Sequence, residues 1–132
     1  MQQISPYRRW RRALLSALVV GAMTLPTWHS ALAGDKEAGA QLYQQRCATC
    51  HGADGKGQTP IAQALNPKPR DHTDGAYMNA LSKDHLTKVI KDGGSAVGLS
   101  PLMLPQADLN AEQIRQLVTF VRSLAVPAYK SN

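Results

Sequence analysis

Apolar residues recur at helical spacing in three segments of this 132-residue chain, and no segment shows the alternation that is typical of a β-strand. The first segment covers residues 36–47, where Ala38, Leu42 and Tyr43 fall on one face. The pattern therefore predicts an all-α protein whose first helix carries a narrow apolar stripe.

The other two predicted helices have recognisable start and stop signals. Ser82 is a good N-cap for the second helix, which stops at residues 93–94, two glycines. The third helix begins at Asn110, where Gln113 is placed to close a capping box, and Pro127 ends it. Apolar residues at helical spacing predict the buried faces: Leu86, Val89 and Ile90 in the second helix, and Ile114, Leu117, Val118, Val121 and Leu124 in the third.

Two long segments rich in glycine and proline, residues 51–76 and 93–109, separate the helices. Unstructured connections of this length in a compact domain are usually functional or disordered. A large flat ligand held between the two segments would order both. The tail at residues 128–132 is expected to fray.

The N-terminal part of the chain has the three-part pattern of a secretory signal peptide. Four arginines precede an uncharged, mostly apolar run at residues 13–25, and Pro26 ends this run. Ala31 and Ala33 are the small residues that signal peptidase reads, so residues 1–33 are predicted to be cleaved from a domain of residues 34–132. A membrane anchor is the alternative, but a spanning helix needs roughly 20 apolar residues. Paired arginines also suggest twin-arginine export, yet the residues after them are not apolar, which favours general secretion.

Cleavage changes the interpretation of the charge. The chain has 15 Lys and Arg against 9 Asp and Glu, but four arginines leave with the signal, so the mature balance is 11 minus 9, or +2. No basic stripe with interleaved aromatic residues remains, which argues against nucleic acid as a partner. The remaining 99 residues suffice for one small domain, and a domain of this size usually has a disulfide framework, a metal or a cofactor in its core.

The only two cysteines lie in the segment CATCH, residues 47–51. A thioredoxin-type redox pair would need a neighbouring βαβ pattern, which is absent. A tetrahedral zinc site would need a fourth ligand, and no second pair of Cys or His follows at short spacing. A disulfide between Cys47 and Cys50 would close a tiny loop and leave His51 without a role. The fourth interpretation, C-x-x-C-H as a site of covalent haem attachment, uses all three residues.

The spacing of these three residues suits the chemistry of haem. Two thiols one helical turn apart can each add across one of the two vinyl groups on one edge of the macrocycle. His51 directly follows Cys50 and would bind the iron as the proximal ligand. One haem c, bound through Cys47 and Cys50, is therefore the predicted cofactor, and an exported location agrees with it.

In these residues the chain resembles the small single-haem class I cytochromes c of bacterial periplasms. CATCHGADGKG is similar to that family's attachment segment, and LNAEQIRQLVTFVRSL is similar to its closing helix. Gly39 and Tyr43 match the positions by which the family's first helix crosses the last, where Phe120 and Leu124 would meet them. The resemblance implies a class I cytochrome c fold in the periplasm, with three main helices and long loops wrapped around one haem.

The resemblance also implies the sixth ligand of the iron. Similar proteins bring a methionine from the loop between the second and third helices, which in this chain is Met103 between two prolines. Met78 is an alternative, although its neighbours also suit a core position. His72 and His85 are further alternatives, and both are expected at the surface.

Two contacts outside the first coordination shell follow from the same resemblance. A proline after the motif, Pro60 here, is expected to lend its carbonyl to the free N–H of the proximal histidine. Arg70 is predicted to pair with a haem propionate. Three glycines that follow the motif, Gly52, Gly55 and Gly57, are expected to permit tight loop geometry.

These ligands predict a function. Iron capped by His51 and Met103 has no ready access for a substrate, so the protein is predicted to be an electron carrier and not an enzyme. It would be a monomer that docks briefly with periplasmic or membrane-bound redox proteins through a haem edge bordered by Leu102, Met103 and Leu104. Two alternatives stay open: a haem subunit of a larger dehydrogenase or oxidase, and a haem peroxidase or ligand-binding protein if Met103 is not coordinated.

Overall fold

A computed structural model describes the backbone of residues 29–130 and the side chains of residues 34–130. The described chain is helical, and its only strand-like feature is an isolated bridge between Asp74 and Val126, so the all-α prediction is confirmed. Within these residues no helix has the length and apolar character needed to cross a membrane. The elements are α1 (His29–Arg46), α2 (Ala48–His51), α3 (Pro60–Ala64), α4 (Gly75–Met78), α5 (Lys83–Asp92), the 3-10 helix η2 (Gly94–Val97) and α6 (Ala111–Ser123).

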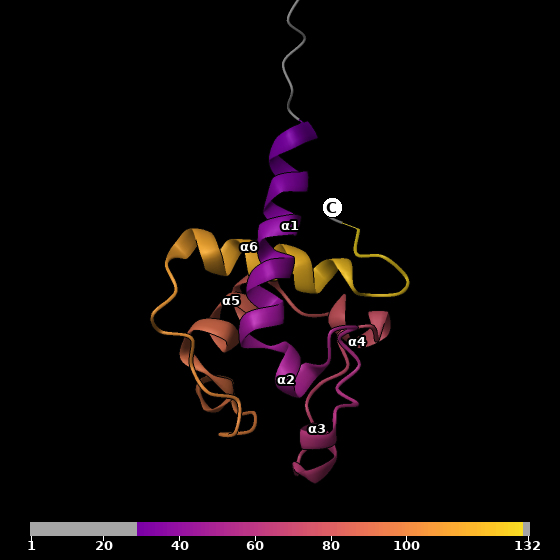
Figure 1. Cartoon of the computed structure of the whole chain (residues 1–132), viewed down its shortest axis with the longest axis vertical. Coiled ribbons are helices and arrows are strands. Elements are labelled where there is room, and N and C mark those ends of the chain that lie inside the picture. The colour runs from indigo at the N-terminus through magenta and orange to yellow at the C-terminus, as the bar shows by residue number, and fades with distance from the viewer. Residues whose placement is uncertain (1–28, 131–132) are drawn as a thin grey trace, which may run out of the picture.

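The two longest helices, α1 and α6, cross each other and form the main helix–helix contact of the molecule (Figure 1). A Cβ atom added at Gly39 would lie only 2.1 Å from the carbonyl oxygen of Gln116, so the helices approach almost backbone to backbone. Tyr43 is fully buried at the same crossing, with its ring centroid 5.0 Å from that of Phe120. The predicted crossing of the first and last helices is therefore confirmed.

The predicted boundaries of α5 and the start of α6 are also confirmed. The hydroxyl of Ser82 accepts a hydrogen bond from the backbone N–H of His85 at 3.0 Å, and α5 stops at Gly93, whose φ is +83°. Asn110 and Gln113 form the complete capping box, with reciprocal hydrogen bonds of 2.9 and 3.0 Å. These ends follow the sequence because capping satisfies backbone groups that the helix itself leaves unpaired.

Other boundaries differ from the prediction. Helix α1 begins at His29 and continues through the expected cleavage site. Residues 51–76 were predicted to be a loop, but they contain α3 and the first two residues of α4. Both helices are single turns that start from a side-chain cap, Thr59 for α3 and Asp74 for α4. A single turn is too short for apolar periodicity to show, and this explains why the pattern did not reveal these helices.

The core is formed mainly by α5, α6 and Tyr43 of α1. Tyr43 and Leu117 are fully buried, and the other buried members are Met78, Leu86, Val89, Ile90, Leu109, Ile114, Val118, Phe120, Val121 and Ala125. Arg122 is the one buried charged side chain among the described residues. Its Nη2 donates to the carbonyl of Leu81 at 2.7 Å, and its guanidinium lies 3.8 Å from the ring of Tyr129. Tyr129, although 39% exposed, therefore contacts the body of the protein in a segment where the sequence suggested fraying.

The crossing of α1 and α6 yields a testable prediction. Gly39→Ala places a methyl group against the carbonyl of Gln116, and the overpacking should lower the free energy of unfolding by about 2–3 kcal/mol. The matched control is Gly34→Ala in the same helix, where nothing lies within 4 Å of the added Cβ, and its effect should stay below about 1 kcal/mol. Chemical denaturation of both variants measures the difference. Equal effects at the two positions would contradict a close helix crossing.

Candidate haem-binding site

A cavity of about 320 Å³ lies between α2, α5, α6 and the segment that precedes α6. This segment connects η2 to α6 and contains Met103. Its walls are largely apolar and come from the predicted buried faces of the two later helices: Leu86, Val89 and Ile90 of α5, and Leu117 and Val121 of α6. Leu99, Leu102 and Leu104 also line the cavity and are 43, 53 and 68% exposed. The cavity therefore reaches the surface beside these leucines.

The attachment segment forms one wall of the cavity. Cys47, Cys50 and His51 all line it, and both cysteines are free and half-buried. The backbone N–H groups of Cys50 and His51 donate to the carbonyl of Cys47 at 3.1 and 2.9 Å, so one helical turn separates the two thiols. Burial raises the pKa of the Cys47 thiol to about 11, because a thiolate would lose its hydration.

The glycine-rich loop after α2 folds back against the attachment segment. The backbone N–H of Gly57 donates to the carbonyl of His51 at 2.7 Å. Gly52, Gly55 and Gly57 have φ values of +79°, +80° and +64°, which confirms that these positions need glycine for tight loop geometry. Thr59 completes the loop: its hydroxyl donates to the carbonyl of Thr49 at 2.9 Å and accepts from the N–H of Ala62 at 3.0 Å.

His51 is held in a definite orientation. Its Nδ1 donates to the backbone carbonyl of Arg70 at 3.1 Å, and burial lowers the pKa of the ring, which favours the neutral form. A neutral imidazole with Nδ1–H satisfied presents Nε2 as a metal ligand. The sequence prediction assigned this carbonyl to Pro60, and the structure corrects it. Pro60 is the first residue of α3, where carbonyls accept intrahelical hydrogen bonds, and it does not line the cavity.

The charged residues around the cavity are all basic. Arg46, Lys68 and Arg70 line it, and no Asp or Glu is among the described lining residues. The guanidinium of Arg70 lies 4.0 Å from the ring centroid of Tyr77, another lining residue. This part of the cavity suits the anionic groups of a ligand. The pairing of Arg70 with a haem propionate remains a prediction.

His72 is half-buried and its ring faces His51, so the expectation that it lies at the surface was wrong. Its ring stacks on the ring of His51, with centroids 4.3 Å apart and an interplanar angle of 17°. Its Nδ1 shares a hydrogen bond of 3.1 Å with the hydroxyl of Tyr43. Burial, with a smaller effect of His51, lowers the pKa of His72 to about 3. Its neighbours in the sequence are polar, so no local signal indicated that this ring turns inward.

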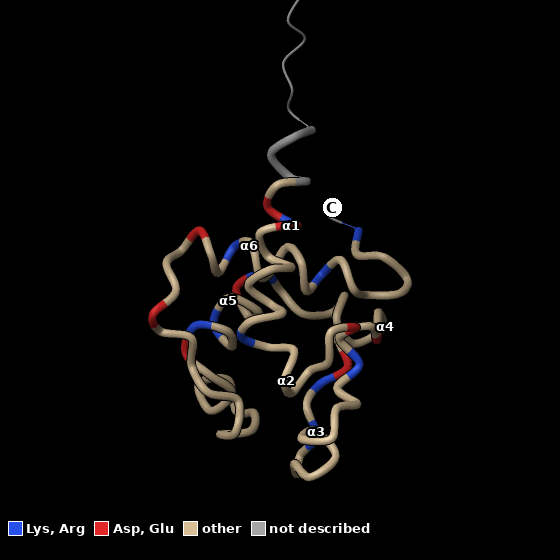
Figure 2. The backbone as a smooth tube through the Cα atoms, in the orientation of Figure 1, with Lys and Arg blue, Asp and Glu red and all other residues tan. Residues whose placement is uncertain are grey.

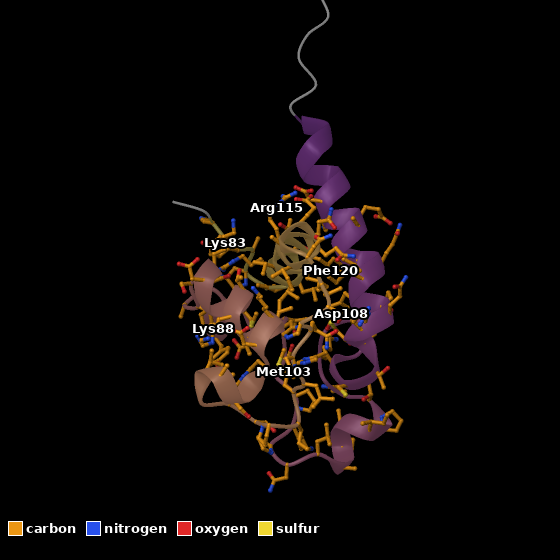
Figure 3. All side chains as sticks on the ribbon, turned by 90° about the vertical axis from the view of Figure 1, so that its left-hand side faces the viewer. Lys83, Lys88, Met103, Asp108, Arg115 and Phe120 are labelled. Atoms are coloured by element: carbon orange, nitrogen blue, oxygen red, sulfur yellow. The ribbon has the colours of Figure 1, made fainter. Side chains whose placement is uncertain are left out.

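The candidates for the sixth ligand lie at different places around the cavity. Met103 is half-buried in the segment before α6, and in the view of Figure 3 its label lies between the α5 side and the α1 side. Its carbonyl accepts from the N–H of Gly94 at 2.9 Å, which ties this segment to η2. Met78, which is 2% exposed, and the half-buried His85 also line the cavity. Ligation by Met103 therefore remains a prediction.

The residues present fit a covalently bound haem. Apolar walls, two thiols one turn apart, an oriented imidazole, a thioether and basic side chains together match a flat apolar macrocycle with reactive vinyl groups and anionic tails. Between residues 34 and 130, no three side chains of His, Cys, Asp or Glu gather as ligands for a bare metal ion. Cys47 and Cys50 would hold the haem, and His51 would bind its iron.

Comparison with known proteins agrees with this geometry. The family model described as cytochrome c matches residues 36–125, and the chain belongs to this family. It is a small class I c-type cytochrome, and membership implies covalently bound haem c. The chain is similar to cytochrome c-555 of Methylococcus capsulatus (strain ATCC 33009 / NCIMB 11132 / Bath), with 32% identity over 116 residues, which cover 85% of this chain and 80% of that protein.

Two solved structures are similar in fold. The KustC0563 c-type cytochrome aligns with a TM-score of 0.55 and 30% identity over 66% of this chain and 96% of its own. A chain of the Kuenenia stuttgartiensis reducing HAO-like protein complex Kustc0457/Kustc0458 aligns with a TM-score of 0.56 and 25% identity over 67% of this chain. The alignment covers only 42% of that second chain.

The two hydrogen bonds of Thr59 yield a second prediction. Thr59→Ala removes the N-cap of α3 and the tie to the attachment segment, and it should lower the free energy of unfolding of the haem-bearing protein by about 1–2 kcal/mol. Thr59→Ser keeps the hydroxyl and should retain most of the stability. Denaturation monitored by helical circular dichroism compares the two variants. A serine variant as unstable as the alanine variant would show that the methyl group matters and the hydrogen bonds do not.

Proposed function

We propose that this protein is an exported one-electron carrier whose haem iron is bound by His51 and Met103. The observation that supports it best is that the attachment segment and the Met103 segment line the same apolar cavity. Bound haem supplies an Fe(III)/Fe(II) couple, and two protein ligands leave the iron no open position for a substrate. The protein would thus transfer electrons without catalysing a reaction of its own.

The residues of the chain set the conditions for this transfer. The carbonyl of Arg70 orients His51, and such contacts outside the first shell tune the ligand and its metal. Apolar side chains of α5 and α6 keep water from the site, and together with a thioether ligand they favour Fe(II) over Fe(III). We therefore expect a higher potential than two histidine ligands would give.

Exposed leucines at the mouth of the cavity support the proposal that redox partners dock there. Leu99, Leu102 and Leu104 are apolar and accessible, a composition that suits brief contacts with periplasmic or membrane-bound redox proteins. Basic and acidic residues are interspersed along the chain in Figure 2. Some form ion pairs, such as Arg46 with Asp108 at 2.8 Å and Lys88 with Asp92 at 2.9 Å. We expect weak docking of a monomer and no strong steering by charge of one sign.

A second candidate function is that of a haem subunit in a larger assembly. It is favoured by the similarity to a chain of the reducing HAO-like protein complex. The similarity to KustC0563, which this chain matches over 96% of its length, favours the free carrier. We propose the free carrier because the matched domain is nearly the whole of that relative.

The proposed ligation is tested by substituting the two described methionines. In the haem-bearing protein, Met103→Leu should abolish the weak far-red sulfur-to-iron absorption band of the oxidised state. It should also lower the reduction potential by on the order of a tenth of a volt or more, because the axial ligand largely sets the potential. Carbon monoxide should then bind the reduced variant and not the wild type. Optical spectra and redox titration measure these changes.

The matched control for that experiment is Met78→Leu, since Met78 lines the same cavity. It should keep the band and most of the potential, because a buried Met is replaced by a side chain of similar volume. Loss of the band in Met78→Leu alone would assign the ligand to Met78. Carbon monoxide binding by the reduced wild type would favour a ligand-binding or peroxidase function instead.

Export to the periplasm yields a further prediction. Cleavage after Ala33 should give a mature protein that begins at Gly34, because Ala31 and Ala33 occupy the positions read by signal peptidase. N-terminal sequencing of the red protein from the periplasmic fraction tests this. Ala33→Arg should leave the precursor uncut, and Ala33→Ser should be processed normally. A red protein that retains residues 1–33 in the membrane fraction would indicate an anchor.

A further inference from the structure

The closest aromatic contact of the proposed iron ligand is with a second histidine. The rings of His51 and His72 are nearly parallel, at 17°, with centroids 4.3 Å apart. By comparison, Tyr43 meets Phe120 at 55° and His72 at 64°, angles that are common where rings merely fill a core. A parallel stack covers one face of the His51 ring and resists its tilting.

His72 is itself fixed by contacts with two other parts of the chain. Its backbone N–H donates to the carbonyl of Gly55 at 2.8 Å, and its Nδ1 is hydrogen-bonded to the hydroxyl of the fully buried Tyr43. Gly55 permits this approach, since a Cβ added there would lie 3.3 Å from the Cβ of His72. Asp71 holds the turn by accepting from the backbone N–H and hydroxyl of Thr73, both at 2.7 Å.

The hydrogen bond from His51 to Arg70 does not by itself fix the ring plane. It anchors only the Nδ1 edge of the ring to one carbonyl oxygen, and small combined rotations about the Cα–Cβ and Cβ–Cγ bonds can still tilt the opposite edge within the tolerance of that contact. A stacked neighbour restricts this remaining motion. The hydrogen bond and the stack together restrict the imidazole more than either contact alone.

We propose that His72 is a positioning residue that fixes the plane of the His51 imidazole and hence the direction of the axial ligand. This inference rests on the proposed ligation of iron by His51. The plane of an axial imidazole decides which iron d orbitals it overlaps, and this overlap sets how unpaired spin is distributed over the haem. The role of His72 is therefore visible in a spectroscopic signature that packing alone would not change.

The test uses the oxidised haem-bearing protein and the proton NMR shifts of the four haem methyl groups. His72→Leu removes the stack, and it should re-order or compress these shifts and move the reduction potential. The far-red sulfur-to-iron band should persist, because the opposite ligand is untouched. His72→Phe retains a flat ring but lacks the hydrogen bond to Tyr43, so it should keep the wild-type order of methyl shifts and change them by less than His72→Leu does.

The matched control is Tyr129→Leu, because it also replaces an aromatic ring with leucine but lies outside the cavity lining, where its ring contacts Arg122. Its methyl pattern should equal that of the wild type. An unchanged pattern in His72→Leu, or an equal change in Tyr129→Leu or His72→Phe, would overturn the proposal. A wild-type protein with no low-spin haem spectrum would instead contradict the proposed function.

Should His72→Leu fail to fold, Tyr43→Phe carries the test. This variant keeps the aromatic ring at the helix crossing but removes the hydrogen bond that holds His72. The released His72 ring should shift the same methyl resonances in the same sense as loss of the stack, by a smaller amount. A wild-type methyl pattern in Tyr43→Phe would then overturn the proposal.

Discussion

The close crossing of α1 and α6 at Gly39 is the contact on which the rest of the structure depends. The backbone N–H of Cys47 donates to the carbonyl of Tyr43 at 2.9 Å, so α1 leads into the attachment segment without a flexible loop. Helix α6, which Gly39 approaches, also supplies Leu117 and Val121 to the wall of the cavity. The crossing therefore fixes the position of the two thiols relative to the apolar wall that faces them.

The chain supports His51 from several distant segments. His51 directly follows the second cysteine, so the local sequence sets its place in the attachment segment. The acceptor of its hydrogen bond, the carbonyl of Arg70, lies 19 positions later in the chain. His72 then covers the ring face and is itself held from α1 through Tyr43. Because these contacts are linked through the two histidine rings, a change in one is expected to alter the orientation of the His51 ring.

The site combines a constrained interior with an accessible mouth. The exposed leucines beside Met103 belong to a segment tied to η2 by the hydrogen bond from Gly94. Charges on the described surface are partly paired and of both signs. This arrangement suits a protein that exchanges electrons through brief contacts, since weak docking allows rapid release. The same apolar mouth would also serve a lasting interface in a subunit.

The crossing of α1 with α6 was predicted only through the resemblance to a known family, whereas the sequence by itself determined the attachment motif, the ends of α5 and the start of α6. These features are local: two cysteines and a histidine within one turn, and caps within three residues of the helix they start. Only the tertiary structure decided that Arg70, and not Pro60, supplies the carbonyl to His51, because every residue carries a carbonyl and the sequence does not show where it points. It alone placed His72 against His51, because a histidine in a polar segment has no periodicity that reveals burial.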